Sequence, residues 1–246
     1  MAGKLFLYGI APVQQCLLHQ NRVCHELFVK DLKTKAPRIK EIISLASQQG
    51  VPVKTADPHT LGKMANTRLH QGVALGCGEL QTLSMQDFLD SEAARSRHLL
   101  IALDQLEDPQ NVGAIIRSAA FLGAGGLITL KKNSSPLSAT VSKASAGALE
   151  YFPVIEVNNL SETLQQLKKE GYSVAGATMG DNSVPFNEAP VSDWMVLVMG
   201  NEGQGLRRLT EKRCDTLIYI PGKKHTESLN VSAAAAILVQ HLVTKG

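Results

Sequence analysis

The spacing of apolar and polar residues changes character about a third of the way along the 246-residue chain. In the first part, short apolar runs alternate with amphipathic stretches, a pattern typical of a small α/β module. Strands are predicted at residues 5–9, 25–29, 51–54 and 72–76, and helices at residues 12–19, 39–49 and 57–64. A module of residues 1–78 is small, but it is within the size that folds alone.

From residue 98 onward, the apolar runs become continuous, and amphipathic stretches separate them. Strands that are buried on both faces have this pattern, so we expect a parallel sheet covered by helices on each side. Strands are predicted at residues 99–103, 126–130, 154–157, 172–178, 194–199 and 216–220, and helices at residues 112–122, 139–149, 160–170 and 231–243. Such sheets bind ligands beyond the carboxyl ends of their strands, so chemistry is expected in those loops.

These patterns divide the chain into a module at residues 1–78, a polar connector with one weak helix at residues 79–97, and a larger domain at residues 98–246. The first module holds ten Lys and Arg against four Asp and Glu, whereas the remainder of the chain holds fifteen against eighteen. A basic module joined to a slightly acidic domain favours a polyanionic partner, such as nucleic acid, for the module. A solvated basic face without function is the alternative.

The cysteines, the apolar segments and the start of the chain argue against several classes of protein. The four cysteines form no C-x-x-C pair, so we expect free thiols and no metal site at Cys16, Cys24, Cys77 and Cys214. The longest apolar stretch, residues 233–239, is far shorter than the ~20 residues that cross a bilayer. The first residues lack the features of a secretory signal. We therefore expect a cytoplasmic protein without a membrane partner.

The first loop with candidate chemistry follows the predicted strand at residues 99–103. Asn111 is suited to cap the next helix. Arg117 follows among apolar residues, where a guanidinium is costly unless it binds a carboxylate or a phosphate. Two interpretations stay open for this arginine: a functional contact with an anion, and a buried salt bridge to Asp104 or Glu107.

The second loop, residues 200–206, is rich in glycine. Glycines at positions 200, 203 and 205 let the backbone approach a ligand closely and present amide donors. Glu202 lies between these glycines, and a carboxylate there would repel a phosphate. The loop therefore suits a ligand that is neutral or cationic where it touches Glu202, and a tight turn without a ligand is the alternative. Its G-x-x-G-x-G spacing also differs from the G-x-G-x-x-G dinucleotide fingerprint.

The third loop begins at Ile220 and leads into the last predicted helix. Ser228 and Asn230 are suited to cap this helix, and capping alone would explain either residue. Four consecutive alanines at residues 233–236 follow, so the helix starts with little side-chain bulk and leaves room for another backbone or a ligand.

Together, and in this order, the three loops resemble the motifs of the SPOUT methyltransferases, in the SpoU/TrmH branch that methylates ribose 2′-oxygens. The resemblance covers about residues 98–246 and rests on residues 108–119, 198–205 and 220–232. The first module, with residues 7–10 and 70–73, is similar to the L30-like RNA-binding domain of the bacterial 23S rRNA guanosine-2′-O-methyltransferases. Transfer RNA ribose methyltransferases share the three motifs, so it is the first module that favours ribosomal RNA.

The resemblance implies an α/β SPOUT fold with a carboxy-terminal trefoil knot, a homodimer, and S-adenosylmethionine (SAM) as the cofactor. SAM carries a sulfonium and no phosphate, which agrees with a carboxylate at position 202. The residues implied in cofactor binding are Thr178, Met199, Gly200, Gly203, Ile220, Pro221, Ser228 and Leu229. The residues implied in catalysis are Arg117, Asn111, Glu202, Ser228 and Asn230, with Arg117 near a site that the partner subunit completes.

Arginine is an awkward general base, because its side-chain pKa lies above about 12. Our hypothesis is that Arg117 holds the phosphate next to the reacting ribose and polarises the hydroxyl, while the other implied catalytic residues orient this hydroxyl or pass its proton on. The third motif departs from the family pattern of Pro-Met followed by Gly, because Gly222 and Lys224 occupy two of these positions. The added charge favours RNA phosphate or alters the cofactor pocket.

Two other functions fit the sequence less well. A non-catalytic RNA-binding or ribosome-assembly factor has no need for Arg117, Glu202 and Asn230 together. A nicotinamide-dependent oxidoreductase requires a ribose-binding acid about 20 residues after a correctly placed fingerprint, which the chain lacks. The sequence therefore favours SAM-dependent 2′-O-methylation of an RNA ribose, with a guanosine of 23S rRNA as the preferred target and tRNA as the alternative.

Overall fold

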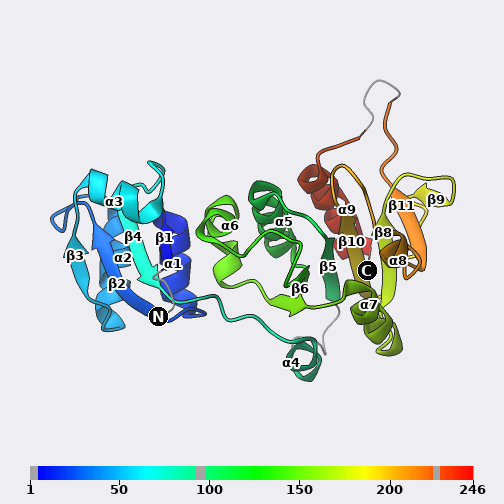
Figure 1. Ribbon diagram of the computed structural model, residues 1–246, viewed down its shortest axis with the longest axis horizontal. Helices are drawn as coiled ribbons and strands as arrows, with labels where there is room; N and C mark the ends of the chain where they lie inside the picture. The colour runs from blue at the N-terminus through cyan, green and yellow to red at the C-terminus, as the bar shows by residue number, and fades with distance from the viewer. Residues whose placement is uncertain (1–4, 92–97, 224–227, 246) are drawn as a thin grey trace. The chain divides into compact units, whose positions relative to one another are not determined.

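A computed structural model describes residues 5–91, 98–223 and 228–245, which belong to two compact units. The amino-terminal unit comprises Met1–Gln81 together with Leu137–Tyr151, and the carboxy-terminal unit comprises Thr82–Pro136 together with Phe152–Gly246. Figure 1 shows the helices and strands of each unit. The sequence predicts that residues 137–151 belong to the larger domain, whereas in the structure they pack with the amino-terminal residues.

The amino-terminal unit is built on a four-stranded sheet with the strand order β1-β4-β2-β3. Strand β4 is antiparallel to β1 and β2, and β3 is parallel to β2. Helices α1 and α2 pack on one face of the sheet, and α3 packs on the other. The elements are β1 (Leu5–Tyr8), α1 (Ile10–His19), β2 (Cys24–Val29), α2 (Pro37–Gln48), β3 (Val53–Thr55), α3 (Pro58–Ala65) and β4 (Val73–Cys77).

The segment that joins this unit from later in the chain contains α6 (Ala139–Ala144) and the short 3-10 helix η2 (Ala148–Glu150). The sequence predicts one continuous helix over residues 139–149, which is wrong. The helix breaks because Ala146 and Gly147 adopt positive φ angles of 53° and 87°. A Cβ atom at Gly147 would lie 2.8 Å from the carbonyl oxygen of Ala11, so close packing against α1 requires glycine here.

A buried ion pair also fixes this segment within the amino-terminal unit. The Arg22 Nε donates to the Glu150 Oε2 at 2.7 Å, and the two side chains are only 1% and 0% exposed. The Ser142 hydroxyl donates to the Glu150 Oε1 at 2.7 Å. The carboxylate is therefore fully engaged, as a charge in a dry interior requires.

The carboxy-terminal unit contains a seven-stranded sheet with the order β7-β6-β5-β10-β8-β11-β9, and all of its paired strands are parallel. The predicted parallel sheet is confirmed. Strand β9 and helix α8 were not predicted, because three and four residues are too few to show a period. The elements are α4 (Met85–Asp90), β5 (His98–Asp104), α5 (Pro109–Leu122), β6 (Gly126–Leu130), β7 (Val154–Val157), α7 (Leu160–Lys169), β8 (Ser173–Ala177), β9 (Ser183–Pro185), β10 (Trp194–Gly200), α8 (Arg208–Glu211), β11 (Thr216–Tyr219) and α9 (Val231–Lys245).

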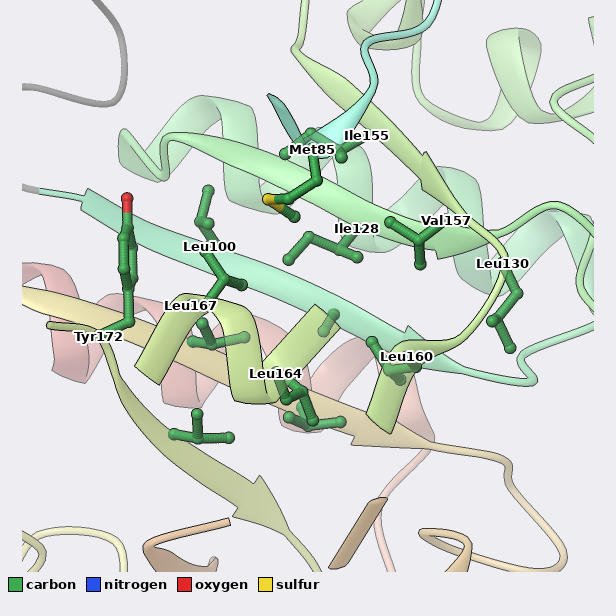
Figure 2. Close-up of a cluster of buried hydrophobic side chains, with 14 of the residues drawn as sticks. Met85, Leu100, Ile128, Leu130, Ile155, Val157, Leu160, Leu164, Leu167 and Tyr172 are labelled. Atoms are coloured by element: carbon green, nitrogen blue, oxygen red, sulfur yellow. The ribbon is translucent and has the colours of Figure 1, made fainter. Parts of the chain in front are cut away.

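Helices cover both faces of this sheet. Leu160, Leu164 and Leu167 of α7 recur at the spacing of one helix face, and Figure 2 shows them over the sheet. Helices α5 and α9 pack against each other and against strands β5, β6 and β10 on the opposite face. This layering leaves the loops at the carboxyl ends of the strands free to form a site.

The cysteines of both units are free thiols. Burial raises the pKa of Cys214 to about 12, so this thiol stays protonated at neutral pH. Within the described ranges, no group of three or more His, Cys, Asp or Glu side chains is placed to hold a metal ion. A helix long and apolar enough to cross a membrane is also absent from those ranges.

Candidate functional site

Three side chains from segments that are distant in the sequence meet at the carboxyl ends of β5 and β10. Asn111 lies in the first turn of α5, Glu202 follows β10, and Asn230 precedes α9. The Asn230 Nδ2 donates to the Asn111 Oδ1 at 3.0 Å and to the Glu202 Oε1 at 3.4 Å. The Asn111 Nδ2 donates to the same carboxylate oxygen of Glu202. The structure thus brings together three of the five residues that the resemblance implies in catalysis.

The two asparagines are oriented in different ways. Asp108, and not Asn111, caps α5, because the Asp108 carboxylate accepts from the backbone amide of Gln110 at 2.9 Å. The predicted capping role of Asn111 is therefore wrong, and its side chain, only 8% exposed, is held instead between Asp108 and Glu202. Asn230 does cap its helix: its Oδ1 accepts from the Ser232 amide at 2.9 Å, which turns its Nδ2 toward the cluster.

The Glu202 carboxylate keeps its negative charge available to a ligand. Its hydrogen-bond partners, Asn111 and Asn230, are neutral amides, and the described part of the chain contains no cation in a salt bridge with it. The side chain is exposed. A carboxylate with only neutral partners favours a cationic or neutral ligand over a phosphate.

The glycine-rich loop folds back on itself. The Asn201 amide donates to the Gly205 carbonyl at 3.0 Å, and the Gly205 amide donates to the Asn201 carbonyl at 2.8 Å. A Cβ atom at Gly200 would lie 2.4 Å from the carbonyl carbon of Gly205, a separation that no side chain can adopt. The glycine at position 200 is thus required by the turn itself.

Replacing Gly200 by alanine is expected to lower the free energy of unfolding by about 1–3 kcal/mol, because the added methyl group has backbone rather than flexible side chain in its way. Urea unfolding of the full chain measures this loss. Gly203→Ala is the matched control, since a Cβ there would meet nothing closer than the Asn201 Oδ1 at 3.7 Å. Equal stability of the two variants would contradict the steric argument.

An ion pair between Arg207 and Asp104 holds the glycine-rich loop against β5, and it was not predicted from the sequence. The buried Asp104 carboxylate accepts from the Arg207 backbone amide at 2.9 Å and from the Arg207 Nε at 2.6 Å. The Asn201 Nδ2 also donates to the Gln105 carbonyl at 3.0 Å. The position of Asp104 at the end of a buried strand indicates that this acid needs a partner. The sequence spacing does not identify that partner, because Arg207 lies 103 residues away. This pair positions the loop that carries Glu202.

Arg117 is exposed on α5, so the prediction of a buried guanidinium is wrong. The predicted alternative of a salt bridge to Asp104 is also wrong, because Arg207 occupies that carboxylate, and the described residues contain no ion pair between Arg117 and Glu107. The helical period explains the error, because Arg117 shares its exposed face with Gln110 and Phe121, whereas the buried face carries Val112, Ile115, Ile116 and Ala119.

The residues implied in cofactor binding follow neighbouring strands of the sheet. Thr178 follows β8, Met199 and Gly200 end β10, and Ile220 follows β11. Because β10, β8 and β11 are adjacent and parallel, these positions lie at the same edge of the sheet. Met199 is buried. The exposed members of this group are Gly203, Pro221, Ser228 and Leu229. Lys224 lies outside the described residues.

Two family models match the chain, one for each part that the sequence distinguishes. Residues 98–240 match the SpoU rRNA Methylase family. The chain belongs to this family. Residues 6–83 match the substrate-binding domain of RNA 2′-O ribose methyltransferases. The basic module of this SpoU family member therefore resembles a domain that binds RNA.

Curated relatives and solved structures extend the similarity of this SpoU methylase over nearly its whole length. A protein of Staphylococcus epidermidis, named for the TrmH family of tRNA/rRNA methyltransferases, is 37% identical over 242 residues, which cover 98% of this chain and 96% of that protein. An AdoMet-bound rRNA methyltransferase from Sinorhizobium meliloti superposes with a TM-score of 0.80 at 21% identity, over 98% of this chain and 87% of the other.

A SpoU methyltransferase from Streptomyces viridochromogenes, named AviRb and solved with AdoMet, gives a TM-score of 0.80 at 20% identity, over 99% of this chain and 90% of the other. These likenesses show that the chain has the fold of the SpoU methyltransferases. The trefoil knot within that fold stays a prediction.

Proposed function

We propose that this protein transfers the methyl group of SAM to the 2′-hydroxyl of a ribose in RNA. The observation that carries the proposal is the hydrogen-bonded cluster of Asn111, Glu202 and Asn230, which three separate segments of the chain build at the carboxyl edge of the sheet. All three residues lie within residues 98–240, which match the SpoU rRNA Methylase family. Two solved structures of similar fold contain AdoMet, another name for SAM.

The residues present fit SAM. Glu202 is a carboxylate with neutral partners at a loop whose backbone turns tightly through Gly200 and Gly205, an environment that suits a cation without phosphates. When bound, SAM supplies a methyl group on a positively charged sulfur, which an oxygen nucleophile can displace. The residues proposed to hold it are Thr178, Met199, Gly200, Gly203, Ile220, Pro221, Ser228 and Leu229.

The protein's own residues must align the ribose hydroxyl and remove its proton, because a free hydroxyl is a poor nucleophile at neutral pH. Arg117 is proposed to hold the phosphate next to the ribose and to polarise the hydroxyl, a task for which an exposed guanidinium without a described carboxylate partner is suited. Asn111, Glu202, Ser228 and Asn230 are proposed to orient the hydroxyl or to pass its proton on.

The preferred substrate is a guanosine of 23S rRNA in the cytoplasm. The basic module supports RNA as the partner, because its ten Lys and Arg outnumber its four Asp and Glu within residues 1–78. Its similarity to a substrate-binding domain of RNA methyltransferases supports the same partner. The relatives are named for both tRNA and rRNA, so tRNA is the alternative substrate.

A homodimer is proposed to form across the face of α5 and α9. Phe121, on the same face of α5 as Arg117, is 87% exposed, and Ile237 of α9 is 40% exposed. Burying a phenylalanine side chain stabilises an interface by about 1.5–3 kcal/mol. Such an interface would bring Arg117 of one protomer close to its partner and so complete the site.

Replacing Phe121 by glutamate is therefore expected to raise the dissociation constant of the dimer about 10- to 100-fold. Light scattering after size-exclusion chromatography over a range of protein concentrations measures this constant. Leu209→Glu is the control, because Leu209 is an exposed apolar side chain of the same unit, 65% exposed, but lies on α8. If both variants stay dimeric, the dimer does not use this face.

Incubation with SAM labelled in its methyl group tests the proposed function. Undermodified 23S rRNA and bulk tRNA are offered separately, and nuclease mapping locates the label. Label on a ribose of a 23S guanosine supports the full proposal, and label found in tRNA alone overturns the rRNA substrate while leaving the chemistry intact. Calorimetry that detects no SAM binding to the folded protein would overturn the chemistry.

A further inference from the structure

A basic pocket lies in the carboxy-terminal unit, away from the candidate site. It has a volume of about 290 Å³ and is lined by Gln165, Lys168, Lys169, Lys212 and Arg213. Four of these five side chains carry a positive charge, although the chain beyond residue 78 holds more acids than bases. The four cationic side chains around this pocket are therefore a local cluster, which the overall composition of the unit does not explain.

The pocket lies at the opposite edge of the sheet from the candidate site. Helix α7 starts after the carboxyl end of β7 and ends just before β8 begins, so Lys168 and Lys169 lie near the amino end of β8. Lys212 and Arg213 precede β11 at the same edge. Strands β8, β10 and β11 have five, seven and four residues. At roughly 3.3 Å per residue, the pocket and the site are roughly 13–23 Å apart.

Arg213 is held in place without losing its charge. Its Nε donates to the Ser161 hydroxyl at 3.0 Å. With the Gln165 amide turned so that its oxygen faces the guanidinium, this oxygen accepts from the two terminal nitrogens of Arg213 at 2.6 and 3.2 Å. Both acceptors are neutral, so they fix the direction of the guanidinium but do not cancel its charge. A fixed, uncompensated guanidinium is suited to bind a phosphate.

Of the three lysines that line the pocket, one is paired with a carboxylate, and the other two are available to bind an anion. The Lys168 ammonium pairs with the Asp215 carboxylate at 2.5 Å. Lys169 and Lys212 are exposed and have no salt bridge within the described part of the chain. Glu170 and Glu211 are their neighbours in the sequence, but neither side chain lines the pocket.

Stabilisation of a helix end is a simpler explanation for two of the four cations. Lysines in the last turn of a helix stabilise its dipole, which accounts for Lys168 and Lys169 at the end of α7. The same explanation is weaker for Lys212 and Arg213, because Lys212 caps α8, a helix of only four residues with a small dipole. Both side chains nevertheless line the same hollow as the lysines of α7. The convergence of cations from two elements points to an anionic ligand.

We propose that this pocket binds a phosphate of the RNA backbone, at a distance from the ribose that is methylated. The proposal rests on the proposed function for its choice of RNA as the source of the phosphate. Contacts of this kind position a nucleic acid and contribute affinity, but they do not read its sequence. The pocket would thus hold the substrate at a second point on the catalytic unit.

The test compares charge reversals in the full-length protein. Lys212→Glu changes the pocket, and Lys245→Glu is the matched control, because Lys245 is an exposed lysine of the same unit that does not line the pocket. Binding of a fluorescein-labelled 30-nucleotide polyuridylate is measured by anisotropy at several salt concentrations. Both substituted side chains are exposed, so both variants are expected to fold, which circular dichroism verifies.

Lys212→Glu is expected to weaken binding of the polyuridylate about fivefold or more and to reduce the slope of log K against log salt by about 1, whereas Lys245→Glu changes neither quantity appreciably. Equal effects of the two reversals would overturn the proposal, because they would reflect net charge alone. Binding of inorganic phosphate to the pocket by nuclear magnetic resonance, together with unchanged polyuridylate binding in Lys212→Glu, would also overturn it in favour of a small-anion site.

Two further readouts separate this proposal from the proposed function. SAM binding is measured by calorimetry and is expected to be the same in Lys212→Glu and the wild type, because the pocket is at the other edge of the sheet. With undermodified 23S rRNA as substrate, the variant is expected to raise KM about fivefold and to leave kcat unchanged. A normal KM for naked rRNA with a raised KM for ribosomal particles would overturn the proposal and indicate an acidic protein partner.

Discussion

Replacing Arg117 by alanine is expected to lower kcat for RNA methylation about 100- to 1,000-fold, a loss of about 2.7–4 kcal/mol of transition-state stabilisation. The physical reason is that a guanidinium stabilises negative charge at the ribose oxygen and holds the adjacent phosphate, two tasks that a methyl group cannot perform. Single-turnover measurements with saturating SAM isolate the chemical step. SAM affinity is expected to stay unchanged, because Arg117 is not among the proposed cofactor residues.

Two further variants sharpen this test. Arg208→Ala removes another exposed arginine of the same unit and is expected to leave the single-turnover rate within about twofold of the wild type. Arg117→Lys keeps the charge but loses the planar fork, so its rate is expected to stay well below normal. A near-normal rate for Arg117→Lys would exclude a bidentate clamp, and a near-normal rate for Arg117→Ala would remove this residue from the mechanism.

Replacing Glu150 by alanine is expected to lower the free energy of unfolding by about 3–5 kcal/mol, because it leaves the Arg22 guanidinium charged, buried and without its carboxylate. Urea unfolding followed by circular dichroism measures the loss. Glu41→Ala is a matched control, since Glu41 is an exposed glutamate on α2 of the same unit, and such surface substitutions change stability by about 0.5 kcal/mol or less.

The double variant Arg22→Met, Glu150→Leu distinguishes a missing partner from a general packing defect. Removing both charges leaves no ion to desolvate, so most of the lost stability is expected to return. If the double variant is as unstable as Glu150→Ala, the loss comes from the shape of the cavity and the electrostatic explanation fails.

The sequence predicts the parallel sheet well because the strands of the larger domain, apart from β9, are mainly apolar runs, and such runs can be read locally. The same reasoning places Asn111, Glu202 and Asn230 in loops after strands, and the parallel topology brings those loops to one edge. Their mutual hydrogen bonds could not be predicted, because these depend on which strands are neighbours. The order β5-β10-β8 is a property of the folded sheet and leaves no trace in the order of the chain.

Two errors at the site have local physical causes. Arg117 has apolar neighbours in the sequence, but the helical period places them on the other face, so their proximity along the chain does not imply burial. Asp108 and Asn111 are both suited to cap a helix, and the position of Pro109 decides between them, because proline is favoured in the first turn directly after the cap. The Asp104–Arg207 pair was beyond sequence reasoning, since nothing in the spacing joins the two residues.

The Arg22–Glu150 pair has a consequence for how this protein could be cut or recombined. The region that matches the SpoU rRNA Methylase model, residues 98–240, includes Glu150, whereas its counter-ion belongs to the region that matches the substrate-binding model. A gene fragment that ends at residue 81 would encode a module with an unneutralised internal guanidinium, and the complementary fragment would carry an orphaned carboxylate. The boundary between the two family regions therefore differs from the boundary between the two folded units. A fusion that transfers the amino-terminal unit to another enzyme has to include residues 137–151.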